Sequence, residues 1–268
     1  MKKELLWTYL RQINIFMTLW VNLRIFPLSV ALKMPIWVFG KMKMGHVYRG
    51  CVEFDEPVRR GLLRIGLHNP SIFCMSSVTS LVVRGKLIVH GHCFVGNGAK
   101  IGVAKNAVLE LGDFSRIGPD SKIYCEDHIV IGESVGISWE SQIFDTNFHY
   151  YVHDGVIKRK NGPVVIGHHC WIGNRSTISK NTKLPPYSII ASNSLVNKDF
   201  SNNKEGGMYV GQPARLMEEY CIRILREDEG VVDTVFNDDV ERCSLDLVKE
   251  KIEYAKRNHI IIKDKWTC

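Results

Sequence analysis

The N-terminal region, residues 1–45, lacks an uncharged apolar run long enough to cross a membrane. It is apolar and basic, but its longest stretch without a charged residue lies between Arg11 and Arg24 and has twelve residues. A membrane-spanning helix needs about twenty, so we expect no transmembrane segment. Two interpretations stay open for this region: a cap over the end of the core, or an amphipathic segment that contacts an anionic membrane.

The eight cysteines form no Cys-x-x-Cys pair. That spacing is typical of zinc and redox sites, and paired cysteines are typical of secreted proteins. We expect the thiols to be reduced and no signal peptide to be present, hence a cytoplasmic protein. The basic N-terminus suggests, as an option, peripheral contact with the inner face of the cell membrane. The net charge of +7 suits an anionic ligand or an anionic membrane surface, and we expect no nucleic-acid partner.

A branched aliphatic residue recurs at every sixth position in long runs. One run passes through Ile166, Ile172, Ile178, Leu184, Ile190 and Val196, and an earlier run through Val83, Val89, Val95 and Ile101. A six-residue period is typical of a parallel β-helix. Six residues make one short strand and one turn, and three such sides close a coil whose aliphatic side chains stack on the next coil. A β-sandwich, with turns every 8–12 residues, does not produce this period.

Three motifs stand near the end of the repeat. They are Trp171-Ile172-Gly173, Ser192-Asn193-Ser194-Leu195-Val196-Asn197-Lys198-Asp199 and Gly211-Gln212-Pro213-Ala214-Arg215. These motifs resemble those of the hexapeptide-repeat acyltransferases, in particular the sugar and polysaccharide O-acetyltransferases of the maltose and galactoside acetyltransferase type. Asn193 stands where these proteins usually have glycine. The resemblance implies a left-handed parallel β-helix over residues 81–215 and an acyl-CoA-dependent transferase.

The flanking regions are assigned separately from the repeat. Residues 1–80 are expected to hold the apolar, basic segment and a cap. Residues 216–268 are expected to form a helical extension, in which Ser244 is a candidate N-cap and basic residues gather at the end of the last helix. No chemistry is apparent in this extension, so we expect it to pack on the β-helix or on a trimer.

The six-residue period stops in the middle of the repeat. Ile143 and Ile166 are 23 residues apart, which is no multiple of six, so residues 145–163 are expected to leave the coil as a loop. A loop on a rigid scaffold is a common location for function. In the sugar O-acetyltransferases that this chain resembles, a histidine at this break is the general base, and the match assigns that role to His149. An imidazole with a pKa near 6.5 can accept the proton of a sugar hydroxyl. We expect Asp145, the nearest carboxylate in sequence, to orient the ring.

The resemblance also implies the acyl donor and its site. Coenzyme A is expected in a groove between two β-helices of a homotrimer, with acetyl-CoA as co-substrate and no metal. By position in the motifs, the residues expected to contact it are Asn174, Ser192, Asn197, Lys198 and Arg215. The last two could neutralise phosphates. No serine or cysteine lies in a nucleophile elbow, which favours direct transfer over an acyl-enzyme.

The acceptor implied by the resemblance is a sugar or a lipid-linked oligosaccharide of capsule, O-antigen or exopolysaccharide synthesis. Asp120 and Glu126 are candidates for its pocket, and Glu140 is the next carboxylate after Asp145 that could orient His149.

Two other functions stay open. Some hexapeptide β-helices are carbonic anhydrases that hold zinc through three histidines, and His149, His153, His168 and His169 are possible ligands. A β-helix that serves as a non-catalytic scaffold is the second alternative.

Overall fold

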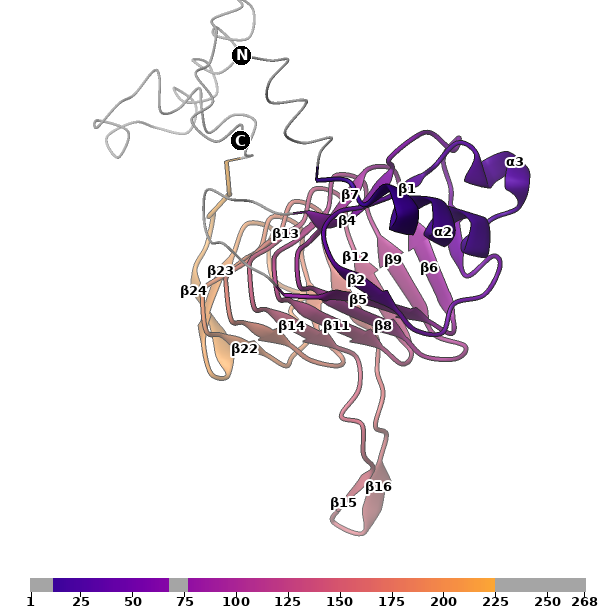
Figure 1. The fold of residues 1–268 in the computed structure, drawn as a ribbon. Coiled ribbons are helices and arrows are strands. Elements are labelled where there is room, and N and C mark those ends of the chain that lie inside the picture. The colour runs from indigo at the N-terminus through magenta and orange to yellow at the C-terminus, as the bar shows by residue number, and fades with distance from the viewer. Residues whose placement is uncertain (1–11, 68–76, 225–268) are drawn as a thin grey trace, which may run out of the picture. The chain divides into compact units, whose positions relative to one another are not determined.

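The computed structural model describes residues 12–67 and 77–224. Within them, three sheets form the sides of a parallel β-helix (Figure 1). The chain visits sheet 1, sheet 2 and sheet 3 in a fixed order and then begins the next coil on sheet 1. The parallel β-helix of hexapeptide repeats predicted from the sequence is confirmed.

Each of these three sheets takes one strand from most coils. Sheet 1 consists of β1 (Ile36–Val38), β4 (Leu63–Leu67), β7 (Cys93–Gly96), β10 (Arg116–Ile117), β13 (Gly136–Ile137), β18 (Trp171–Ile172), β21 (Ile189–Ile190), β23 (Met208–Gly211) and β24 (Ala214–Glu218). Sheet 2 consists of β2 (Met42–Met44), β5 (Thr79–Val83), β8 (Lys100–Val103), β11 (Lys122–Cys125), β14 (Gln142–Phe144), β19 (Thr177–Ile178) and β22 (Leu195–Val196). Sheet 3 consists of β3 (Val52–Phe54), β6 (Lys86–Val89), β9 (Val108–Leu111), β12 (His128–Ile131), β17 (Val164–Ile166) and β20 (Lys183–Leu184).

The repeating aliphatic residues lie directly opposite one another in neighbouring strands. In sheet 1, Ile117 pairs with Ile137, Ile137 with Ile172, and Ile172 with Ile190. All four side chains are buried. Because side chains alternate between the two faces of a strand, an aliphatic residue in register points inward on every coil. The interior is a column of stacked aliphatic side chains, which accounts for the period.

The β-helix begins at Ile36, well before Leu81, where the period predicts its start. Strands β1, β2 and β3 form the first coil and pair in parallel with β4, β5 and β6. The expectation that residues 1–80 form a separate cap is therefore wrong from Ile36 onward. The physical reason is that the connections between these strands differ in length, so their buried residues do not fall on a step of six.

Two helices cover the end of the first coil. They are α2 (Ile15–Ile25) and α3 (Leu28–Ala31). The Asn22 side chain donates to the backbone carbonyl of Ile36 at 2.7 Å and accepts its N–H at 3.1 Å. The Thr18 hydroxyl accepts the N–H of Val38 at 3.0 Å. These bonds pair backbone groups on the open edge of β1, which would otherwise be free to pair with another strand. Among the residues described, no helix has the length and apolar character that crossing a membrane requires.

The opposite end of the β-helix closes with an antiparallel pair. β23 and β24 pair so that Arg215 lies opposite Val210. Residues 216–218 continue β24, so the helix predicted from residue 216 is wrong over this stretch. Pairing of residues 214–218 with the open edge of β23 is favoured over the weak helix propensity of this segment. The chain divides into the units Met1–Ile222 and Arg223–Cys268, and the helix predicted after Ser244 lies outside the described residues.

The outer face of sheet 3 carries a chain of charged side chains. His90 contacts Asp55 through Nδ1 and Glu110 through Nε2 at 3.0 Å, and His128 contacts the other oxygen of Glu110 at 2.7 Å. Partial burial lowers the pKa of His90, but its bonds to the two carboxylates outweigh this and the net shift is upward. Burial raises the pKa of Glu110, and its bonds to both histidines more than reverse the change, so the net shift is downward.

We expect this cluster to stabilise the protein more in mildly acidic than in alkaline solution. The raised pKa of His90 contributes stability that is complete below its unfolded pKa near 6.5 and is lost as the pH rises through its folded pKa. The lowered pKa of Glu110 contributes above its unfolded pKa near 4.3 and is lost as the pH falls through its folded pKa. In urea unfolding, His90→Gln should therefore cost more free energy of unfolding at about pH 5.5 than at about pH 8.5. Equal losses at both values would contradict the charge-based account.

Candidate active site

The break in the period corresponds to a β-hairpin that leaves the coil between sheets 2 and 3. After β14 the chain runs outward to β15 (Tyr151–His153), returns through β16 (Val156–Lys158) and rejoins the coil in β17. In Figure 1 the hairpin projects away from the β-helix. Residues 145–163 are therefore an antiparallel hairpin on a short neck, which consists of residues 145–148 before β15 and residues 159–163 after β16. His149 lies between the neck and β15.

Asp145 anchors the neck in the preceding coil. Its side chain is fully buried and accepts the backbone N–H groups of Glu126 at 2.7 Å and Asp127 at 2.8 Å. The Cys125 thiol donates to the same carboxylate at 3.4 Å. On the returning side of the neck, the N–H of Gly162 donates to the Asp145 backbone carbonyl at 2.9 Å. Burial raises the pKa of Asp145, and the two backbone donors oppose this rise. One residue thus ties both sides of the neck to the coil.

The structure contradicts the expectation that Asp145 orients His149. Both carboxylate oxygens are taken by donors of the coil, and no hydrogen bond to the His149 ring occurs among the described residues. The chain leaves the coil at Asp145, and this exit leaves two backbone N–H groups of the neighbouring coil in need of a buried acceptor. Asp145 therefore positions the hairpin. Glu140, the alternative, forms an ion pair with Arg175 at 2.5 Å.

A second set of contacts closes the neck. The Thr146 hydroxyl donates to Glu126 at 2.6 Å and accepts the N–H of Phe148 at 2.9 Å. Lys160, on the returning side, forms an ion pair with Glu126. The N–H of Asn147 donates to the Lys160 backbone carbonyl at 2.8 Å. Glu126, a candidate for the acceptor pocket, thus binds both sides of the neck, through Thr146 and Lys160.

Phe148 sets the course of the chain into the hairpin. Its backbone is left-handed, with φ of 63°. Its ring packs on Tyr124, with centroids 5.3 Å apart, and on Phe144, with centroids 5.7 Å apart. The three rings line an open groove of about 470 Å³ on the outer face of sheet 2. His149 is the next residue after Phe148, which lines the groove, and its side chain is exposed. The same left-handed conformation recurs at other corners of the coil, for example at Phe114 and Tyr187, so it marks a tight turn of the chain.

Sequence reasoning missed two parts of this site. Thr146 and Lys160 close the neck through contacts that cross the loop, and no local pattern marks such contacts. Tyr124 lies under Phe148, and for this residue the sequence carries a signal. It stands at an outward position of its strand and pairs in register with Phe144 of the next coil, so two outward aromatic residues follow each other.

The histidines considered as zinc ligands lie in different places. His153 is on the exposed hairpin strand, 3.4 Å from Asp154. His168 and His169 lie at the corner between sheets 3 and 1, where their rings contact each other and that of Tyr187. Within residues 12–67 and 77–224, no three His, Cys, Asp or Glu side chains are grouped so that they could hold a metal ion.

Asn174 and Ser192, two residues expected to contact coenzyme A, touch each other. They lie on successive coils at the corner between sheets 1 and 2, and the Ser192 hydroxyl donates to Asn174 Oδ1 at 2.5 Å. The side chain of Gln212 donates to the carbonyl of Asn193 at 2.6 Å. Asn193 has φ of 58°, a left-handed conformation that glycine adopts freely and asparagine tolerates. Asparagine in place of the usual glycine therefore fits this corner.

Asn197 and Lys198 lie at a different corner. They follow β22 and lead from sheet 2 towards sheet 3, which is the corner from which the hairpin leaves on an earlier coil. Arg215 lies on β24, at the end of sheet 1. All three side chains are exposed. Four of the predicted donor residues thus occupy two corners separated by the width of sheet 2, and the fifth, Arg215, lies on the last strand of sheet 1. A ligand that touches all of them must cross that sheet or be shared between two chains.

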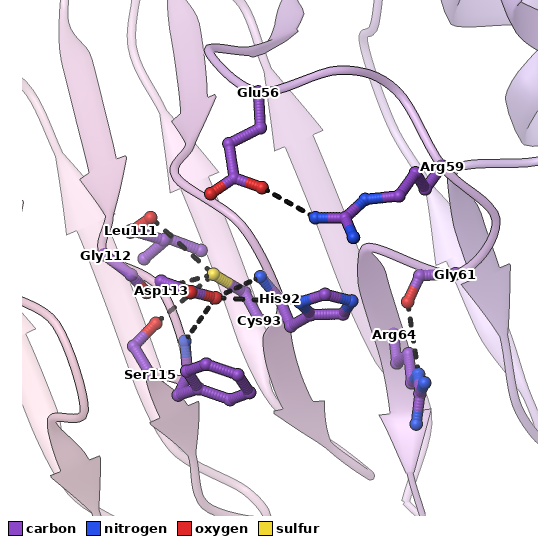
Figure 2. Close-up of polar contacts among 11 residues, drawn as sticks. Glu56, Arg59, Gly61, Arg64, His92, Cys93, Leu111, Gly112, Asp113 and Ser115 are labelled. Atoms are coloured by element: carbon purple, nitrogen blue, oxygen red, sulfur yellow. Dashed lines mark hydrogen bonds and ion pairs between the residues drawn. The ribbon is translucent and has the colours of Figure 1, made fainter.

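The buried cysteines are poor nucleophiles. Figure 2 shows the Cys93 thiol beside the backbone carbonyls of Leu111 and Gly112, to which it donates. Burial raises the pKa of Cys93 to about 12 and that of Cys170 to about 12. Burial also raises the pKa of Cys125, which lies against the neck. Since the thiolate is the reactive form of cysteine, these thiols stay protonated and inert near neutral pH.

Comparison with known proteins places the chain in a family. No protein-family model matches it. An uncharacterized 24.8 kDa protein in the cps region of Klebsiella pneumoniae is 30% identical over 156 residues, which are 58% of this chain and 68% of that protein. The chain belongs to the family of that protein.

Several solved structures of acetyltransferases resemble this chain at low identity. The polysialic acid O-acetyltransferase OatWY is 17% identical with a TM-score of 0.49, over 69% of this chain and 91% of its own. The polysialic-acid-specific acetyltransferase NeuO is 16% identical with a TM-score of 0.46, over 71% of this chain and 89% of its own. A hexapeptide-repeat acetyltransferase from Vibrio cholerae, crystallised with acetyl-CoA, is 21% identical with a TM-score of 0.38, over 45% and 64%.

Proposed function

We propose that this protein transfers an acetyl group from acetyl-CoA to a hydroxyl group of a saccharide, with His149 as the general base. The observation that carries the proposal is the neck of the hairpin, which holds Phe148 on the wall of the sheet 2 groove; His149 is the next residue along the chain. The motif resemblance supplies the reaction class. The relative in a cps region supports a saccharide acceptor of capsule, O-antigen or exopolysaccharide synthesis.

In this reaction the His149 imidazole accepts the proton of the acceptor hydroxyl as the oxygen attacks the thioester carbonyl. The new carbon–oxygen bond creates an oxyanion, for which backbone N–H groups are common donors. The oxyanion collapses, the carbon–sulfur bond breaks, and the imidazolium returns the proton to the departing thiolate. Direct transfer is favoured over an acyl-enzyme because burial raises the pKa of Cys93 and that of Cys170 to about 12.

The donor is proposed to lie along the C-terminal coils, where Asn174 and Ser192 are hydrogen-bonded to each other. Lys198 and Arg215 are exposed cations suited to the phosphates of coenzyme A, and Asn197 adjoins Lys198. Because Asn174 and Ser192 lie at a different corner from Asn197 and Lys198, we propose a homotrimer in which two neighbouring chains share each donor site. A stable and fully active monomer in analytical ultracentrifugation would contradict the trimer.

Release of free thiol from acetyl-CoA tests the proposed reaction. The protein is mixed with acetyl-CoA and with nucleotide sugars, lipid-linked oligosaccharides or capsular polysaccharides, and coenzyme A is measured with a thiol reagent. We expect release that depends on one class of acceptor, together with one added acetyl group in the acceptor by mass spectrometry. Acceptor-dependent release with none of these saccharides would refute the proposed function.

We also propose that α2 contacts the inner face of the cell membrane. Val21 and Ile25 are buried, whereas Phe16, Trp20 and Leu23 are 77%, 43% and 49% exposed. Between Glu4 and Glu53 the sequence has no acidic residue, and its basic residues there are Arg11, Arg24, Lys33, Lys41, Lys43 and Arg49. Aromatic side chains favour the interfacial zone of a bilayer, and basic residues are attracted to anionic lipid.

Replacing Phe16 and Trp20 by serine should weaken binding to anionic vesicles roughly tenfold or more. Phe16 is 77% and Trp20 43% exposed, so their loss removes lipid contacts, while the buried Val21 and Ile25 still pack α2 on the β-helix. Co-sedimentation with phosphatidylserine vesicles at low and high salt measures the change, since screening should weaken the attraction. Phe114→Ser, which removes a 48% exposed ring elsewhere, is the control. Wild-type protein that ignores anionic vesicles would end this proposal.

A further inference from the structure

The groove beneath the hairpin neck is basic as well as aromatic. It lies on the outer face of sheet 2, over β5, β8, β11 and β14. Its cationic residues are Arg84, Lys100, Lys105 and Lys122, and its aromatic residues are Tyr124, Phe144 and Phe148. No Asp or Glu belongs to the lining among the described residues. A concave surface lined with charges of one sign raises the local concentration of ligands of the opposite sign.

Lys100 and Lys122 lie directly opposite each other in neighbouring parallel strands. Neighbouring strands are about 4.8 Å apart, and like charges in opposed positions destabilise a sheet. The Lys100 ammonium donates to the carbonyl of Val78. Neither lysine has a carboxylate partner in the part of the chain that the structure describes. The repulsion between them is thus uncompensated within these residues, and an anionic ligand would relieve it.

Tyr124 and Phe148 form an aromatic wall next to these lysines. Their ring centroids are 5.3 Å apart and their planes are inclined by 31°. Gly102, which pairs with Tyr124, makes room for the ring, because a Cβ atom there would lie 2.7 Å from it. Ligand sites commonly combine aromatic walls with a few charged groups that fix orientation. A sugar ring that carries a carboxylate or phosphate offers a flat C–H face and a negative charge together.

We propose that this groove binds the acceptor and that the acceptor is an acidic saccharide. Its carboxylate or phosphate groups pair with Lys100 and Lys122, while a sugar ring lies against Tyr124 and Phe148. The inference rests on the proposed acetyl transfer at His149, because it names the substrate class of that site.

The phosphates of coenzyme A are anionic too and could also bind these lysines. The position of the groove distinguishes coenzyme A from an acidic saccharide. The groove lies on coils that precede the hairpin, over β5 to β14. Asn174 and Ser192 lie on coils that follow the hairpin. His149 leaves the β-helix between these two regions. The acceptor and the donor therefore reach His149 from opposite directions along the β-helix, and the groove belongs to the acceptor.

Isothermal titration calorimetry of the full chain, without an acyl donor, tests the assignment. The probes are oligogalacturonate and its methyl ester, which keeps the sugar rings and removes the charge. We expect oligogalacturonate to bind and the ester to bind at least roughly tenfold more weakly. Lys122→Gln should weaken oligogalacturonate binding roughly tenfold, with unchanged affinity for coenzyme A. Lys204→Gln, which removes a 68% exposed lysine near the other end of the β-helix, is the matched control and should change neither.

The assignment would be overturned if oligogalacturonate did not bind or if its ester bound equally well. It would also be overturned by equal effects of Lys122→Gln and Lys204→Gln, or by a parallel loss of coenzyme A affinity in Lys122→Gln. The last would assign the groove to the donor phosphates. A changed sedimentation coefficient in Lys122→Gln would assign it to an interface between copies and would also overturn the proposal. The titration is independent of acetyl transfer. Lys122-dependent binding without any thiol release would refute the transferase and leave an acidic-saccharide site.

Discussion

Replacing His149 with alanine should lower kcat/KM for acetyl transfer roughly 10²- to 10⁴-fold, the usual effect of losing a general base. The fold should stay intact, because the side chain is exposed and makes no hydrogen bond among the described residues. Steady-state thiol release measures the rate. Thermal unfolding and titration with coenzyme A, both expected to be unchanged, show that the loss is chemical. Added imidazole should restore part of the rate, which a purely structural role would not allow.

His153→Ala is the matched control for this experiment. His153 lies on the same hairpin, is 66% exposed and contacts Asp154 at 3.4 Å. Its loss removes another exposed imidazole, from a residue that does not line the groove, so the rate should stay within about threefold of wild type. If His149→Ala also stayed within about threefold, His149 would not be the base. A large loss in His153→Ala alone would move the role to that residue.

Asp145→Ala should have the second largest effect, through the structure of the hairpin. It leaves the N–H groups of Glu126 and Asp127 without their buried acceptor. An unsatisfied buried donor costs about 1–3 kcal/mol, so the free energy of unfolding should fall by at least ~2 kcal/mol. Acetyl transfer should fall as well, because the neck no longer holds His149 in place. Hydrogen exchange over residues 145–163, followed by mass spectrometry, should show faster exchange in the variant.

Asp145→Asn separates anchoring from an effect on the imidazole. The amide keeps one acceptor oxygen but turns an NH₂ group towards the second backbone donor. We therefore expect a smaller destabilisation than with alanine and an intermediate rate of hydrogen exchange in the hairpin. If Asp145→Asn abolished transfer while unfolding and hydrogen exchange matched wild type, the anchoring account would be wrong. A direct influence on His149 would then have to be reconsidered.

The six-residue period predicted the β-helix because the inward position on each side of a coil is a local property of the strand. Ile172, Ile178 and Ile190 occupy such positions, and their spacing follows from one strand and one turn. The place of the hairpin was predictable for the same reason, since an insertion between Ile143 and Ile166 disturbs the spacing at that point. His149 was found by its position in this break, and its role stays a prediction.

The contacts between coils depended on the tertiary structure. Asp145 binds backbone N–H groups of the preceding coil, and backbone groups leave no mark in the sequence. The opposition of Lys100 and Lys122 follows from the register of β8 and β11, which varies with the length of each turn. The first coils were not predicted, because the connections between their strands differ in length and their buried residues do not recur at every sixth position. The sequence by itself determined which side chains each coil buries, since burial follows local alternation. The stacking of coils decided which outward side chains became neighbours, because it joins residues whose separation along the chain is set by every turn between them.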